Sequence, residues 1–328
     1  MNAAGVVRIK QEIVRARTIL LSTHQNPDGD GLGSEIALQA YLRSVGKSAV
    51  ILNPDPVPER YRFLDPGGEI GVFDGAAGAE LVRSCDLLFM LDNSSLNRLG
   101  KMEGAIRATE AVRICIDHHD TTDRFWTVNL VDETACATGE MIFDLIAALG
   151  GSLDPSSAVA LYTALVTDTG HFRFSKTSPR SHRIAAELLR MGVDPSHVYQ
   201  EVYERHSEGF VRLMGQALAA CRIEPGGALA WIALRRAQIE ACGAEDADTS
   251  EMVNQLFGIQ GVRICLLFKE LPDGRIKVSL RSKGALDVNR IASRYGGGGH
   301  QNASGAIVEG PFEAAVQRVV TDARALLP

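Results

Sequence analysis

Four short apolar segments in the first half of the chain constrain its fold more than any other feature. They span residues 18–23, 48–52, 86–91 and 111–116, and segments with helical periodicity lie before, between or after them, at 5–16, 32–45, 137–149 and 155–166. Each apolar segment is continuous rather than alternating. Continuous apolar strands separated by helices are typical of a parallel sheet covered on both faces. The pattern therefore predicts an α/β domain, doubly wound, with a mainly parallel sheet.

A change of pattern in the second half of the 328 residues predicts a second, smaller α/β domain. Strands are expected at 229–234, 262–268 and 275–281, and helices at 248–257, 287–294 and 312–326. The segment between the two patterns has helical periodicity. We therefore expect one domain over 1–188, a helical connector over 189–215 and a second domain over 216–328.

The charge balance is mildly acidic, with 34 Lys and Arg against 40 Asp and Glu and a formal net charge of −6. Nonspecific binding to duplex nucleic acid comes chiefly from Lys and Arg on phosphates. This balance therefore disfavours a protein that coats long duplexes, while a short phosphate ligand is compatible with it. No apolar run approaches the roughly 18 residues of a membrane span, and the N-terminus lacks the pattern of a signal peptide. The expectation is a cytoplasmic protein without membrane contact.

Acidic and imidazole side chains follow several of these segments. The six candidate metal ligands are His24, Asp28, Asp30, Asp92, His118 and Asp168. Ligands of open parallel sheets bind at the carboxyl ends of the strands, so we expect these side chains to converge. An isolated Asp after a strand is more often a cap or turn residue, and a lone His is more often structural. Four such positions in one domain favour a common site.

The convergence of four carboxylates requires positive charge, because crowded carboxylates raise one another's pKa. Divalent cations supply that charge. Mixed carboxylate and imidazole ligands without thiolates favour Mn²⁺, with Mg²⁺ and Co²⁺ as alternatives. Six ligands are too many for one catalytic ion that keeps an open position. We therefore expect two ions that share a bridging carboxylate.

Five motifs in the chain resemble those of a known family. The segments HQNPDGDGLGS, FMLDNS, IDHHD and DTGHFRFS are similar, in this order, to the four successive motifs of the DHH phosphoesterase superfamily. The segments RSK at 281–283, DVN at 287–289 and GGGGHQNASG at 296–305 resemble the signature of its accessory domain, DHHA1. The combination is similar to the bacterial nanoRNase (oligoribonuclease) and pAp phosphatase group, and the resemblance covers nearly the whole chain.

The resemblance implies a role for each residue of the first domain's motifs. One ion would be held by His24, Asp28 and Asp92, and the other by Asp30, Asp92, His118 and Asp168, so that Asp92 bridges the two. The second imidazole of the triplet, His119, would face the scissile phosphate. Asp117 would orient the imidazoles, as metal-bound His usually requires.

The four consecutive glycines before His300 allow two interpretations. Such a run is most simply a flexible linker. It lies, however, between an expected helix and an expected strand, and glycine lets backbone N–H groups approach an anion closely. We therefore expect this loop to bind phosphate or nucleotide, together with nearby cationic side chains. The substrate-binding candidates are Arg281, Ser282, Lys283, Gly297, Gly298, Gly299, His300 and Arg173, the last having a structural salt bridge as its alternative.

These features imply a manganese-dependent phosphoesterase acting on short nucleotides: short RNA oligonucleotides, a linear dinucleotide or the 3′-phosphate of pAp. A metal-activated hydroxide would attack phosphorus, while the second domain would hold the far end of a short ligand. A soluble cyclic-dinucleotide phosphodiesterase is an alternative, and so, from another class, is an inactive nucleotide-sensing protein. The GGGGH signature disfavours an inorganic pyrophosphatase, and the chain length disfavours a RecJ-like exonuclease. The resemblance also implies a homodimer.

Overall fold

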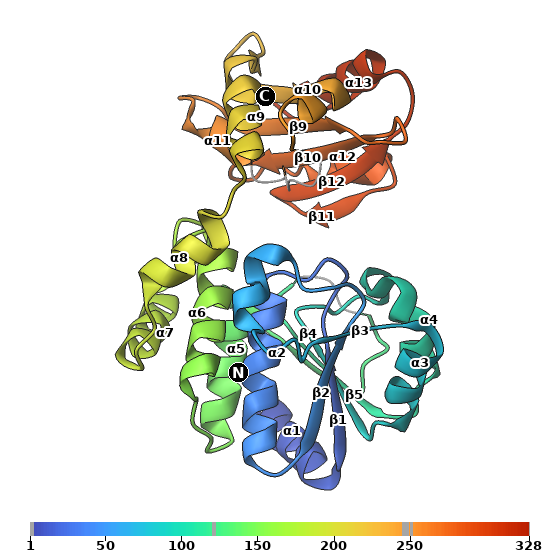
Figure 1. Cartoon of the computed structure of the whole chain (residues 1–328), viewed down its shortest axis with the longest axis vertical. Coiled ribbons are helices and arrows are strands. Elements are labelled where there is room, and N and C mark those ends of the chain that lie inside the picture. The colour runs from blue at the N-terminus through green and yellow to red at the C-terminus, as the bar shows by residue number, and fades with distance from the viewer. Residues whose placement is uncertain (1–2, 120–122, 245–248, 250–251, 328) are drawn as a thin grey trace. The chain divides into compact units, whose positions relative to one another are not determined.

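A computed structural model describes residues 3–119, 123–244, 249 and 252–327 (Figure 1). The chain divides after Arg205 into two compact units, and the described residues of each contain a six-stranded sheet. The division falls inside the segment 189–215, for which we expect a helical connector. Helix α8 (Pro195–Tyr203) belongs to the first unit and α9 (Glu208–Ala219) to the second.

The sheet of the first unit is parallel throughout its described strands. Its strands, in the spatial order β3-β2-β1-β4-β5-β6, are β3 (Gly71–Val72), β2 (Ser48–Asn53), β1 (Thr18–Ser22), β4 (Leu87–Leu91), β5 (Val112–Asp117) and β6 (Val128–Val131). The chain runs outward from β1 to β3 and then returns to β4 on the other side of β1. In open α/β sheets this reversal creates a crevice at the carboxyl ends of the strands, where ligands bind. The expected doubly wound fold is confirmed.

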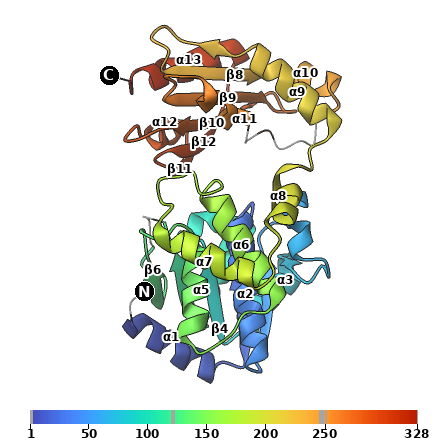
Figure 2. The same ribbon diagram turned by 90° about the vertical axis from the view of Figure 1, so that its left-hand side faces the viewer.

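Helices cover both faces of this sheet, which explains why its strands are continuously apolar (Figures 1 and 2). Leu21 and Phe89 face a core that includes residues of α1 (Ala3–Arg15), α2 (Gly29–Ser44), α5 (Thr138–Ala148), α6 (Pro155–Asp168) and α7 (Pro179–Arg190). Leu20 and Leu88, one position away, face the opposite core with α3 (Gly75–Ser84), the 3₁₀ helix η2 (Leu96–Met102) and α4 (Glu103–Ala108). A second 3₁₀ helix, η1 (Glu59–Leu64), follows β2.

Helix α2 begins earlier than the expected residue 32. Asp28 is its N-cap, and the Asp28 carboxylate accepts hydrogen bonds from the backbone N–H groups of Asp30 and Gly31, at 3.0 and 3.1 Å. A carboxylate in this position satisfies N–H groups that have no partner inside the helix. Asp30 therefore lies in the first helical turn and not in a loop. Strands β3 and β6 were not expected from the sequence, because both are short.

The second unit has a mixed sheet in the order β11-β12-β10-β9-β8-β7, in which β8 and β9 form the one parallel pair among the described strands. The strands are β7 (Arg222–Ile223), β8 (Leu229–Leu234), β9 (Ile264–Glu270), β10 (Ile276–Ser282), β11 (Gly298–His300) and β12 (Ala303–Val308). The strands expected at 229–234, 262–268 and 275–281 are confirmed as β8, β9 and β10, and the strand expected after the glycine run, at 305–308, is confirmed as β12.

The helices of the second unit pack on both faces of its sheet. One core includes α12 (Asn289–Arg294) and α13 (Phe312–Arg324), and the other includes α9, α10 (Arg236–Ala241), α11 (Met252–Gln255) and η3 (Leu256–Gly258). Part of the helix expected at 248–257 lies outside the described residues. The two-domain α/β architecture agrees with the expectation from the sequence.

Candidate metal centre

The loop after β1 places His24 at the switch point with one ring nitrogen unpartnered. Its Nδ1 donates to the Gln25 carbonyl oxygen at 2.7 Å. Its Nε2 lies 3.3 Å from Asp92 Oδ2 and 3.6 Å from Asp28 Oδ2. This buried Nε2 has no well-aligned hydrogen bond within the described structure. A ring nitrogen aimed at carboxylates, with the other nitrogen fixed by a carbonyl, is typical of a metal ligand.

His118, two positions before the undescribed segment 120–122, repeats this arrangement on the other side of Asp92. Its Nδ1 lies 3.3 Å from the Ala135 carbonyl oxygen. Its Nε2 lies 3.3 Å from Asp168 Oδ2, 3.5 Å from Asp92 Oδ1 and 3.7 Å from Asp30 Oδ2. Asp92 therefore presents one carboxylate oxygen to each imidazole. This is the geometry that a carboxylate bridging two cations requires.

The backbone of Asp92 is unusual, because its φ is 56°, in the left-handed region. A non-glycine residue in this region is strained, and such strain is found at functional sites. The residue directly follows β4, and its N–H donates to the Ile116 carbonyl of β5 at 3.0 Å. The turn directs the buried carboxylate toward His24 and His118, and the Thr138 hydroxyl donates to it at 3.3 Å.

Asp30 is held by the N-terminus of α5. The backbone N–H groups of Thr138 and Gly139 donate to its two oxygens, at 2.6 and 2.8 Å. The first N–H groups of a helix have no partner within it and carry partial positive charge, so they stabilise a carboxylate. The sequence predicts a helix at 137–149, and the N-terminus of that helix is the feature that could have indicated this contact. Asp168, the last residue of α6, completes the group with its half-buried carboxylate.

These placements produce three groups of residues. Within each group the ligand atoms all lie within 4.8 Å of one another. The groups are His24, Asp28 and Asp92; Asp30, His118 and Asp168; and Asp92, His118 and His119. The structure thus brings together all six residues that we expect to bind metal. The first group is one of the two ligand sets that the family resemblance implies.

The electrostatics of the cluster indicate a deficit of positive charge. Burial by itself lowers the pKa of His24, but the carboxylates of Asp28 and Asp92 raise that pKa to about 10. The pKa of His118 is also raised to about 10, against burial, chiefly by Asp92. Burial raises the pKa of Asp168 to about 6. Protons on the imidazoles neutralise negative charge of the carboxylates, which divalent cations could neutralise instead. The donor set therefore fits divalent metal ions.

Asp117 and His119 form a separate pair beside the cluster. The His119 Nδ1 donates to Asp117 Oδ1 at 2.5 Å and lies 3.6 Å from Asp92 Oδ1. Asp117 also accepts from the His119 backbone N–H, at 3.2 Å. We expect Asp117 to orient both imidazoles, but the hydrogen bonds of the described structure connect it to His119 and leave His118 to the Ala135 carbonyl.

A buried carboxyl behind the cluster was missed by the sequence reasoning. Glu35 of α2 is fully buried and accepts a hydrogen bond from Asn53 Nδ2 at 2.8 Å, while Asn53 Oδ1 accepts from the Thr23 N–H at 3.2 Å. Burial raises the pKa of Glu35 to about 8. An acidic residue in an amphipathic helix normally faces solvent, so Glu35 gave no signal. Asn53 did give one, because it is a polar residue at the end of an apolar strand.

Two of the expected substrate-binding groups in the second unit serve the local fold. The Ser282 hydroxyl donates to the Leu286 carbonyl at 2.5 Å and accepts from Asn302 Nδ2 at 2.8 Å. The Gly297 N–H donates to the Ala292 carbonyl at 2.9 Å, which removes it from the N–H groups available to a phosphate. The donors of these two groups are therefore used within the unit, and a substrate contact of either residue stays a prediction.

The glycine run is not a linker, because Gly298–His300 is an edge strand paired with β12. A Cβ on Gly297 would lie 2.1 Å from the Gly305 carbonyl oxygen, and one on Gly299 would lie 2.5 Å from the Ala303 carbonyl oxygen. Glycine is therefore required for close packing at both positions. The side chain of His300 lies outside the described residues.

The three expected cationic residues are all accessible to some degree. Arg281 is half-buried on β10, and its Nη1 donates to the Leu280 carbonyl at 3.1 Å. The Lys283 ammonium lies 4.7 Å from the Phe257 ring centroid and donates to the Phe257 carbonyl. The exposed Arg173 guanidinium lies over the Phe174 ring, and among the described residues it has no ion-pair partner that would support the salt-bridge alternative.

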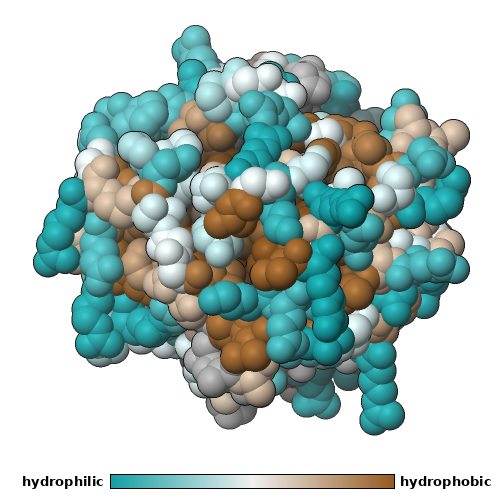
Figure 3. Space-filling view, turned by 90° about the horizontal axis from the view of Figure 1, so that it is seen from below, coloured by the Kyte–Doolittle hydropathy of each residue, from teal (hydrophilic) through white to brown (hydrophobic). Residues whose placement is uncertain are grey.

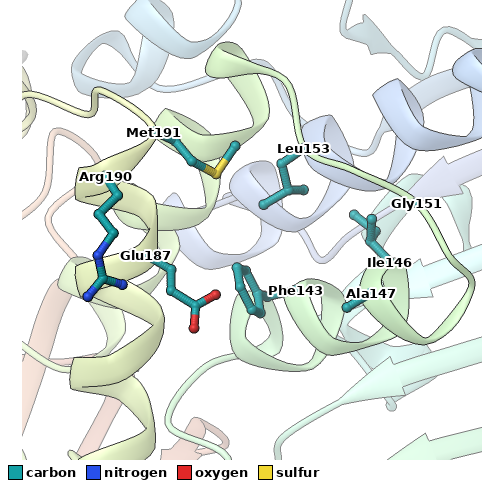
Figure 4. Close-up of a pocket in the computed structure, with 8 residues that line it drawn as sticks. All are labelled: Phe143, Ile146, Ala147, Gly151, Leu153, Glu187, Arg190 and Met191. Atoms are coloured by element: carbon teal, nitrogen blue, oxygen red, sulfur yellow. The ribbon is translucent and has the colours of Figure 1, made fainter.

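A shallow groove of about 290 Å³ lies in the first unit, away from these residues (Figure 4). Phe143 and Ile146 of α5 line it with Leu153, and Glu187 and Arg190 of α7 line its other side. None of the candidate metal ligands contributes to it.

Apolar and hydrophilic side chains intermix on the face seen from below in Figure 3. No helix in the described parts of the chain combines the length and apolar character of a membrane span.

Comparisons with known proteins agree with the two-domain architecture. Residues 18–167 match the DHH family, N-terminal domain, and residues 236–327 match the DHHA1 domain. A Thermus thermophilus protein named bifunctional oligoribonuclease and PAP phosphatase NrnA is 33% identical over 326 residues, or 97% of this chain and 93% of that protein. A Bacillus subtilis protein of the same name is 28% identical, covering 97% of this chain and 98% of that protein.

A solved structure has nearly the same fold. The crystal structure of an exopolyphosphatase-related protein from Bacteroides fragilis superposes with a TM-score of 0.94 and 29% sequence identity. The match covers 98% of this chain and 96% of that one.

Proposed function

Because the chain belongs to the DHH–DHHA1 phosphoesterase family, we propose that it is a metal-dependent hydrolase of short nucleotides. Its substrates would be short RNA oligonucleotides and the 3′-phosphate of pAp. Relatives named for oligoribonuclease and PAP phosphatase activity support this class, since they align over nearly the whole chain. The observation that carries the proposal is the buried Asp92 carboxylate, whose two oxygens face His24 and His118.

In this proposal the cluster holds two divalent cations on either side of Asp92. One would be bound by His24, Asp28 and Asp92, and the other by Asp30, Asp92, His118 and Asp168. Mixed imidazole and carboxylate donors favour Mn²⁺ over Mg²⁺ and Co²⁺ as the working ion. When bound, such a pair supplies Lewis-acid stabilisation of phosphoryl oxygens and a nucleophile from water at neutral pH.

The protein's own residues would position the reacting phosphate. Asp117 fixes the ring of His119, which we propose donates to a phosphoryl oxygen. Lys176 donates to the His118 carbonyl oxygen at 3.0 Å, so it ties the segment after α6 to the loop after β5. In the second unit, Arg281, Lys283, Gly298, Gly299 and His300 are proposed to bind the non-scissile part of a short nucleotide, and Arg173 of the first unit to contact its phosphate.

The test is a panel of initial hydrolysis rates for pAp, the dinucleotide pApA, a short oligoribonucleotide, a cyclic dinucleotide and pyrophosphate. Each would be measured with Mn²⁺, Mg²⁺ or Co²⁺ and after chelation. We expect Mn²⁺-dependent turnover of pAp and the linear RNAs, and none after chelation. Undiminished turnover in the chelated sample would refute the metal requirement, and exclusive turnover of the cyclic dinucleotide or pyrophosphate would refute the proposed substrates.

A further inference from the structure

Arg98, a cation beside the candidate metal centre, has no side-chain partner among the described residues. It lies in η2, which follows the Asp92 loop, and it is half-buried. Its side chain makes no hydrogen bond or ion pair in the described structure. Other arginines of the same unit are paired, such as Arg83 with Glu80 and Arg107 with Glu103. Arg98 therefore retains its N–H donors for a ligand.

Backbone contacts hold Arg98 next to the first group of ligands. The Gln25 N–H donates to the Arg98 carbonyl oxygen at 2.7 Å, and the Gln25 carbonyl accepts from His24 Nδ1 at 2.7 Å. Gly100, with a φ of 50°, approaches Gln25 so closely that a Cβ there would lie 3.0 Å from Gln25 Oε1. The loops after β1 and β4 are thus joined, and Arg98 is one backbone hydrogen bond from the residue that fixes His24.

The segment that carries Arg98 is firmly anchored. Leu99 and Met102 of η2 are fully buried in the core on the α3 side of the sheet. At the start of η2, the Leu96 N–H donates to the Asp123 carboxylate at 2.7 Å. A binding group on such a support is held in place before the ligand arrives, which is what precise recognition requires.

The charge of Arg98 acts on the cluster without being neutralised by it. The guanidinium lies close enough to His24 to repel positive charge there, whereas Asp28 and Asp92 attract it. None of these carboxylates lies within ion-pair distance of Arg98. A fixed cation beside a cation-binding centre is unfavourable until an anion binds between them. Phosphate fits this requirement, because its oxygens accept the paired N–H donors of a guanidinium.

We propose that Arg98 binds non-bridging oxygens of the substrate phosphate at the metal centre. This inference rests on the proposed function, because it assumes that a phosphate is bound there. The loops on the two sides of the switch point would then bind opposite charges. His24 and Asp28 would hold a cation, and Arg98 would hold the phosphate that the cation attracts.

The experiment compares the Mn²⁺-loaded wild type with Arg98→Met, Arg98→Lys and the matched control Lys101→Met, which removes an exposed charge from the same 3₁₀ helix. Isothermal titration calorimetry measures the affinity for Mn²⁺ and for inorganic phosphate, and initial rates measure pAp hydrolysis. We expect Arg98→Met to weaken phosphate binding about tenfold and to lower kcat/KM by about 100-fold. Arg98→Lys should fall between, and Lys101→Met should match the wild type.

The affinity for Mn²⁺ separates a binding role from a structural one. Loss of a repelling charge should leave Mn²⁺ binding by Arg98→Met as tight as in the wild type, or tighter. Weaker Mn²⁺ binding, or phosphate affinity equal to that of the wild type, would overturn the inference. If the wild type hydrolyses no phosphate ester but its phosphate affinity depends on Arg98, the proposed function fails and the inference stands. Normal pAp hydrolysis by Arg98→Met would support the proposed function and overturn the inference.

Discussion

The two sheets of the protein place their strand ends differently. In the first unit the described strands all run in one direction, so the loops after β1, β4 and β5 meet at one edge. In the second unit most neighbouring strands are antiparallel, and successive strands end at opposite edges. A parallel sheet therefore gathers polar residues that are far apart in the sequence, whereas a mixed sheet disperses them.

This difference determines which polar residues remain available for a ligand. Asp92 and His118 face one another across neighbouring strand ends, and among the described side chains those that contact the Asp92 carboxylate are imidazoles and the Thr138 hydroxyl. Ser282 and Gly297, by contrast, have their donors occupied by backbone carbonyls of their own unit. A polar residue after a strand of the first sheet is thus a better indicator of function than a similar residue in the second.

The largest effect is expected at the carboxylate shared by the two ligand groups. Asp92→Asn should lower kcat/KM for pAp by more than about 100-fold, which exceeds the usual cost of losing a supporting residue. The exposed Asp74, whose side chain caps no helix, provides the matched control Asp74→Asn, with an activity like that of the wild type. Near-normal rates for Asp92→Asn would show that strand-end convergence does not create the active centre.

The glycine strand tests the opposite side of the comparison, where residues serve the fold. Gly297→Ala should destabilise the second unit by about 1–3 kcal/mol, because the added methyl group would overlap the Gly305 carbonyl. Gly298→Ala is the matched control: a Cβ there meets no atom within 4 Å, so the cost should stay below about 0.5 kcal/mol. Thermal unfolding measures both. Equal stability of the two variants would indicate that the run is a flexible loop.

The buried Glu35 predicts a pH dependence in the first unit. Its folded pKa of about 8 is above its ordinary value of 4.5. The folded state then holds a proton that the unfolded state releases, so stability falls as pH rises from 4.5 toward 8, by up to about 1.4 kcal/mol per pH unit. Glu35→Gln cannot ionise and should flatten this slope in urea unfolding measured across that range. An unchanged slope would contradict the role assigned to burial.

The smallest effect is expected at Ser282. Ser282→Ala removes two hydrogen bonds within the second unit and should cost about 1 kcal/mol of stability, with kcat/KM for pAp unchanged. Arg281→Met is the comparison, since it removes a proposed phosphate donor and should raise KM. A larger rise of KM in Ser282→Ala than in Arg281→Met would indicate that Ser282 contacts the substrate.

Much of the first unit could be predicted because its pattern is local. Continuous apolar segments identify β1, β2, β4 and β5, and the rule that parallel strands end together brings Asp92 and His118 to one site. The sequence predicts the start of α2 at residue 32, three residues after its actual start at Gly29, because the Asp-Gly-Asp-Gly segment has the composition of a turn. Its capping carboxylate, which favours helix, was given too little weight.

The remaining contacts depend on tertiary packing that a sequence does not display. Glu35 reads as a surface residue of a helix until the Asn53 amide is seen beside it. Arg98 reads as a solvated charge until its backbone contact with Gln25 places it at the centre. Strands of the second sheet could be predicted from the sequence. The hydrogen bond from the Gly297 N–H to the Ala292 carbonyl could not, because it depends on where α12 ends.

The central claim is that Asp92 is shared by two cation sites, and anomalous scattering from Mn²⁺-soaked crystals at the manganese edge tests it most directly. We predict two peaks about 3.5–4 Å apart, one on each side of the Asp92 carboxylate, with His24 and Asp28 at one and Asp30, His118 and Asp168 at the other. A single peak, or two peaks that Asp92 does not contact, would contradict the claim.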